Sequence, residues 1–162
     1  MDEQNITREQ AKILWERAYR YQMKGELGDA IQLYKRSIET YPTAEAYTFL
    51  GWAYSMLGLL DRAIALCKQA IEVDPAFGNP YNDIGAYLME QGRWEEAISW
   101  LEQATAAPRY ASPEFAYMNL GRVYTHQGDV KRALTCFDQA LAEAPLYLPA
   151  TWAKYTLLGV LN

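Results

Sequence analysis

Residues 47–75 decide the fold, and they read YTFLGWAYSMLGLLDRAIALCKQAIEVDP. Apolar residues recur three and four positions apart on both sides of Gly58, which is the spacing of two amphipathic helices. Gly58 suits the left-handed backbone of a short turn between them. Pro75 ends the second helix, because proline lacks an amide hydrogen and clashes with the preceding turn. The stretch therefore predicts a helical hairpin.

The same arrangement recurs along the chain. The glycines at the expected turns are separated by 33, 34 and 36 residues; they are Gly25, Gly58, Gly92 and Gly128. The alanines that follow these turns keep the same intervals; they are Ala30, Ala63, Ala97 and Ala133. So do two series of large residues, Tyr21, Tyr54, Leu88 and Tyr124, and Tyr34, Cys67, Leu101 and Phe137. Independent series with one set of offsets indicate an internal repeat.

The fourth unit follows the pattern with Tyr117, Leu120-Gly121, Tyr124, Ala133, Phe137 and Pro145. A large residue, Leu-Gly, Tyr, Ala, an aromatic residue and a closing proline at these spacings resemble the tetratricopeptide repeat family. The resemblance covers about residues 11–145. It is weakest at Arg17-Ala18, which replaces Leu-Gly in the first unit, and at Pro108, the displaced closing proline of the third unit.

This resemblance implies an all-α fold, a right-handed α-α superhelix of four helical hairpins with a C-terminal capping helix. We expect a single domain over residues 1–162, with repeats at about 11–43, 44–77, 78–111 and 114–147. The capping helix is expected at about 148–161, with Leu148, Trp152, Tyr155 and Leu158 as its inner face. Because Leu157, Val160 and Leu161 are apolar as well, an alternative is that this helix offers a patch for self-association.

Small residues are expected where the two helices of a hairpin touch. Gly51, Gly85 and Gly121 occupy positions at which a side chain would hold the two backbones apart. The repeat intervals show a two-residue excess within residues 106–113. It is interpreted either as a tolerated loop insertion or as a slight break in the superhelix.

Several helix starts are predicted from capping residues. Thr7 with Gln10 resembles a capping box. Asn79 and Ser112 each precede a proline suited to a first helical turn. Asp61 and Asp129 are expected at the starts of second helices, where a carboxylate is favourable.

Composition restricts the function. The net charge of −5 argues against nucleic-acid binding, which needs basic surface. No stretch is long and apolar enough for membrane insertion, and the polar, acidic start of the chain differs from a secretory leader, so a cytoplasmic location is expected. Cys67 and Cys136 are expected to be buried apolar residues rather than a disulfide or metal ligands.

The resemblance implies that the first helices of successive hairpins line a concave, ligand-binding groove. By register, the candidate groove residues are Trp15, Tyr19, Phe49, Trp52, Met56, Asn82, Met89, Phe115, Met118, Asn119 and Arg122. The aromatic and methionine side chains favour an apolar or amphipathic segment of a partner protein or peptide. The alternative is that one or two of the rings pack between neighbouring first helices.

Chaperone-binding members of the family carry a basic clamp for a C-terminal carboxylate, and this sequence departs from it. The register places Trp15, Tyr19, Phe49 and Asp83 where the clamp needs Lys, Asn or Arg. Asp83 would repel a carboxylate. A clamp of this type is therefore not expected.

No catalytic constellation is found. His126 is the only histidine, and no phosphate-binding glycine loop occurs, so we expect no enzyme activity, metal or cofactor. The predicted function is a non-catalytic protein–protein interaction module. The alternative is a structural scaffold or a homo-oligomer assembled through the apolar C-terminal helix.

Overall fold

The computed structural model describes residues 2–159, which form nine α-helices. They are α1 Glu3–Met23, α2 Leu27–Thr40, α3 Ala44–Met56, α4 Leu60–Val73, α5 Asn79–Glu90, α6 Trp94–Ala106, α7 Pro113–His126, α8 Val130–Glu143 and α9 Leu148–Leu157. The predicted all-α superhelix of four hairpins and a final helix is confirmed.

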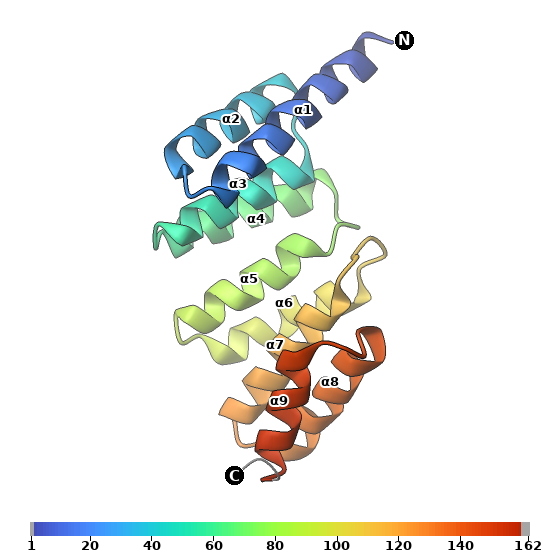
Figure 1. Ribbon diagram of the computed structural model, residues 1–162. Helices are drawn as coiled ribbons and strands as arrows, with labels where there is room; N and C mark the ends of the chain where they lie inside the picture. The colour runs from blue at the N-terminus through green and yellow to red at the C-terminus, as the bar shows by residue number, and fades with distance from the viewer. Residues whose placement is uncertain (1, 160–162) are drawn as a thin grey trace.

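The helices stack in chain order, with α1 at one end of the molecule and α9 at the other (Figure 1). Each helix packs on the next, and α1, α3, α5, α7 and α9 also contact one another in sequence. Within residues 2–159, the second helices of the hairpins make no such contacts with each other. The first helices are therefore closer together and form the inner, concave layer.

The turn glycines and closing prolines act as predicted. Gly25, Gly58, Gly92 and Gly128 have φ of 81°, 76°, 75° and 76°, a left-handed conformation that residues with a Cβ adopt at a cost. Pro42, Pro75 and Pro145 each lie two residues beyond the end of a second helix.

The small positions explain how closely the two helices of a hairpin approach. A Cβ on Gly51 would lie 3.0 Å from the carbonyl oxygen of Ala63 and 3.3 Å from Cys67 Sγ. At Gly85 and Gly121 the space of the missing Cβ is filled by the side chains of Leu101 and Phe137. The prediction of helix contact is thus confirmed, and in two hairpins a large core side chain occupies the space.

The helix starts are only partly as predicted. Thr7 is not a cap, because α1 begins at Glu3 and the Thr7 hydroxyl donates to the carbonyl of Gln4 within the helix. Asn79 is already helical and Gly78 precedes it, while Ser112 holds the cap position without a side-chain cap bond. Asp129 does cap α8 by accepting a hydrogen bond from the amide of Arg132.

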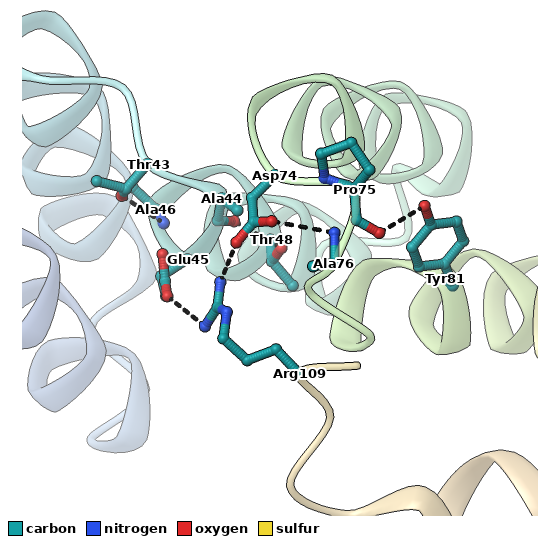
Figure 2. Close-up of polar contacts among 10 residues, drawn as sticks. All are labelled: Thr43, Ala44, Glu45, Ala46, Thr48, Asp74, Pro75, Ala76, Tyr81 and Arg109. Atoms are coloured by element: carbon teal, nitrogen blue, oxygen red, sulfur yellow. Dashed lines mark hydrogen bonds and ion pairs between the residues drawn. The ribbon is translucent and has the colours of Figure 1, made fainter. Parts of the chain in front are cut away.

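The two-residue excess forms an ordered connection. The loop between α6 and α7 pairs with the loop between α4 and α5: the amide of Arg109 donates to Ala76, and that of Gly78 donates to Arg109, each at 3.0 Å. Figure 2 shows the Arg109 side chain between Glu45 on α3 and Asp74 after α4, with N–O distances of 2.9 and 2.6 Å. α6 also packs directly on α7, so the stack continues without interruption.

The orientation of α9 differs from the prediction. Leu148, Trp152, Tyr155 and Leu158 face outward and are 65%, 62%, 41% and 47% exposed. Ala150 is buried instead, and Ala153 and Leu157 pack against the core. The helix has apolar residues on more than one side, so hydrophobicity alone did not identify the face that packs. Val160 and Leu161 lie outside the described residues.

The hairpin contact can be tested at Gly121. We expect Gly121→Ala to lower the free energy of unfolding by about 2–3 kcal/mol, because the new Cβ overlaps the buried ring of Phe137. Gly28→Ala is the matched control, since Gly28 lies in α2 with open space around it and should gain roughly 0.5–1 kcal/mol. Urea denaturation followed by circular dichroism measures both. Equal effects of the two variants would contradict the close-contact interpretation.

Candidate functional site

A cavity of about 450 Å³ lies on the concave layer. Its walls come from α1, α3, α5, α7 and the loop between α6 and α7. The lining residues, which we call the groove, are Trp15, Tyr19, Phe49, Trp52, Asn79, Asn82, Asp83, Tyr110, Ser112 and Phe115. Six of the eleven predicted site residues are therefore brought together here.

Aromatic rings dominate the N-terminal half of the groove. The Phe49 ring lies 5.5 Å from Trp15 and 5.5 Å from Tyr19, and Tyr19 lies 6.3 Å from Trp52, measured between centroids. Trp15 and Phe49 also pack against the core, whereas Tyr19 is 37% exposed. Both interpretations of the rings therefore hold in part: they stack between neighbouring first helices, and their free edges line the groove.

The remaining predicted residues lie elsewhere. Met89 is 5% exposed and belongs to the core, so its prediction as a groove residue is wrong. Met118 packs against the same core, and Met56 is an exposed residue at the end of α3 whose sulfur accepts from Gln22. Asn119 donates to Asn82 at 3.0 Å and so supports the groove wall from behind.

Arg122 belongs to a second cavity of about 570 Å³ near the C-terminal end. There the His126 imidazole stacks on Trp94 with centroids 4.2 Å apart and planes tilted by 15°. Trp152 and Leu157 of α9 complete its apolar wall. Its polar side chains come from α7 and from Thr156 of α9, and it shares no lining residue with the groove.

Four groove residues are absent from the predicted site. Asn79 and Asp83 lie on α5, one of the first helices expected to line the groove, whereas the prediction gave no place in it to Tyr110 and Ser112. Both lie in the loop that carries the two-residue excess, which folds over the edge of α5. A Cβ on Gly78 would collide with the Tyr110 ring, so glycine at this position lets the loop approach. The irregular repeat interval was the signal that could have identified them.

The charge of the groove is concentrated in one residue. Asp83 is the single Asp, Glu, Lys, Arg or His among the lining residues, and it is half-buried. Desolvation by the surrounding side chains raises the pKa of its carboxyl to about 7. The carboxyl is therefore poised between its neutral and ionised forms near neutral pH.

The described part of the chain holds no cluster of metal-ligating side chains, and its two thiols are buried. Residues 2–159 contain no group of three or more His, Cys, Asp or Glu side chains placed to hold a metal ion. Cys67 and Cys136 are buried free thiols, as predicted, and burial raises the pKa of both. In the same residues, no helix has the length and apolar character that a membrane span requires.

Paired helices stacked around an open concave surface define a helical-repeat solenoid. Two models, each described as Tetratricopeptide repeat, match residues 44–77 and 82–147, together more than half of the chain. The chain belongs to the tetratricopeptide repeat family, and this fold supports a role as a protein–protein interaction module.

Individual relatives agree with this family. The chain is 38% identical over 74 residues to the small glutamine-rich tetratricopeptide repeat-containing protein 2 of Mycosarcoma maydis, covering 45% of this chain and 21% of that protein. PilF of Pseudomonas aeruginosa superposes with a TM-score of 0.87 at 22% identity, over 94% of this chain and 69% of that one. YrrB, described as a TPR protein with an unusual peptide-binding site, superposes with a TM-score of 0.70 at 20% identity. The superposition covers 89% of this chain and 74% of that one. The matches span 13% to 31% of the length of the curated relatives.

The raised pKa of Asp83 predicts a pH-dependent stability. Between pH 3.8, its ordinary pKa, and about 7, the folded state holds a proton that the unfolded state has released, so stability falls as pH rises through this window. Asp83→Asn should therefore stabilise the protein by about 2 kcal/mol at about pH 8 and change little at about pH 4. Urea denaturation across this range measures the effect, with Asp29→Asn on α2 as the control. Parallel pH profiles for wild type and Asp83→Asn would contradict it.

Proposed function

We propose that the groove binds an apolar or amphipathic segment of a partner protein, without catalysis. The observation that carries this proposal is the set of aromatic rings that line an open cavity on the concave layer. Trp52 and Tyr19 are not needed to fill the core, since the core packing involves Trp15 and Phe49 instead. An apolar side chain of a partner would cover the free edges of these rings.

The expected affinity is moderate. Each ring is already partly covered by its neighbours, so a ligand can bury only the remainder of the about 150–250 Å² of an aromatic side chain. At about 25 cal/mol per Å², this contributes roughly 1–2 kcal/mol per ring. The amides of Asn79 and Asn82 add hydrogen-bonding groups beside the rings. Together these groups support binding at about micromolar concentration, after the cost of association.

The groove can be tested with a peptide ligand selected on the wild-type protein. Replacing Phe49 and Trp52 together by Ala should weaken its binding by at least about 2 kcal/mol, because the central apolar contacts are lost. Trp52→Ala alone should keep the thermal stability of the fold and still reduce affinity. Trp152→Ala, on exposed α9, is the matched control and should bind normally. Isothermal titration measures affinity, and full affinity of a folded double variant would refute the assignment.

A second candidate function is self-association through α9. Its outward residues Leu148, Trp152 and Tyr155 are largely exposed, and the preceding Leu146 is 92% exposed. Lys154 holds α9 on α8 through an ion pair with Asp138 at 2.6 Å, so the apolar face is presented in a fixed orientation. Such a contiguous apolar face is typical of an interface.

Sedimentation analysis over a range of concentrations separates the two candidates. If α9 mediates assembly, the wild type should form dimers or larger species, and Trp152→Glu should shift them to monomers by placing a charge on the contact face. Phe49→Ala is the control and should leave the oligomeric state unchanged. A wild type that stays monomeric at high concentration would exclude self-association.

A further inference from the structure

Asp83 lies in the groove without a cation. None of the ion pairs within residues 2–159 includes its carboxylate. Burial raises the pKa of its carboxyl. An ionised carboxylate in such a site lacks both full hydration and a counter-charge.

The ionisable groups around Asp83 are all acids. Burial first, and then the charge of Asp83, raise the pKa of the Cys67 thiol from α4, of the Tyr87 phenol from α5 and of the Tyr110 phenol from the loop between α6 and α7. From α1, the groove adds the phenol of Tyr19. The other wall residues from α3 and α7 are uncharged.

The basic residues near the groove are engaged elsewhere. The Arg109 guanidinium is held by Glu45 and Asp74 and lies over the Phe77 ring at 4.3 Å. The Arg122 guanidinium donates to the Asn119 side chain at 3.3 Å and lines the second cavity. Residues 2–159 therefore place no cation in an ion pair with Asp83, although aromatic faces that attract cations surround the same cavity.

We propose that the groove takes a Lys or Arg side chain from the partner segment, set between apolar residues. This inference rests on the proposed function of the groove. The cation would pair with the Asp83 carboxylate, while its aliphatic stem and charge pack against rings such as Tyr19 and Trp52. A free C-terminal carboxylate is excluded by the same charge, so the specificity is opposite in sign to that of a basic clamp.

The test begins with random peptides displayed on phage and selected on the full chain, Asp83→Asn and Asp29→Asn. Peptides selected on the wild type and on Asp29→Asn should be enriched in one Lys or Arg flanked by apolar residues, and those selected on Asp83→Asn should not. One enriched peptide is then synthesised with its basic residue and with norleucine in its place. Fluorescence anisotropy should show about tenfold weaker binding for the norleucine peptide on the wild type, and no such difference on Asp83→Asn.

The pH dependence of peptide affinity gives an independent test. The affinity of the basic peptide for wild type should drop several-fold between about pH 8 and about pH 5.5, because protonated Asp83 no longer pairs with a cation. Asp83→Asn should lose this dependence. His126→Gln, at the stacked pair with Trp94 outside the groove, is the control and should keep it.

The outcomes separate this inference from the function on which it rests. Selected peptides that depend on Trp52 but show no basic residue, or that bind Asp83→Asn with the same preference, would overturn the inference and leave groove binding intact. Selected peptides that ignore both Trp52 and Asp83 would overturn the groove assignment itself.

Discussion

The close approach of the two helices within each hairpin is the constraint on which the structure depends. It requires a small residue on the first helix, which is Ala18 in the first hairpin and Gly51, Gly85 and Gly121 in the other three. Leu101 and Phe137 fill the space beside Gly85 and Gly121. In these hairpins the two helices are held together by complementary packing as well as by hydrophobic burial. This tight pairing lets successive first helices contact one another, while the second helices stay apart. The concave layer, and with it the groove, follows from that difference.

The groove combines an aromatic cluster that also packs the fold with an acidic residue that the fold does not need. Its rings stack across α1 and α3, which stabilises the hairpin interface and also exposes aromatic edges to a ligand. Asp83 works against stability, since its carboxylate is poorly hydrated when ionised. A residue that destabilises the free protein and borders aromatic rings in an open cavity is typical of a binding site.

The sequence was sufficient for the fold because each repeat position has a strict local requirement. The turn glycines need a positive φ and the prolines end helices, and both effects act within a few residues. Six groove residues followed from register alone, since helix periodicity fixes which side chains share a face. Met89 and the face of α9 were misassigned because both helices are apolar on several sides, and neighbours decide which side is covered. Tyr110 and Ser112 lie on a loop, whose path depends on tertiary contacts such as those of Arg109.

The contacts of Arg109 have a consequence for cooperativity. In repeat proteins, stability is approximately a sum over the units and the interfaces between neighbouring units, and end units can unfold separately. Here the guanidinium of Arg109, in the loop before α7, forms ion pairs with Glu45 in the first turn of α3 and with Asp74 just after α4. The backbone of Arg109 also pairs with the loop between α4 and α5. These contacts join the two central hairpins along one edge. We therefore expect the two hairpins to unfold cooperatively, after the outer helices.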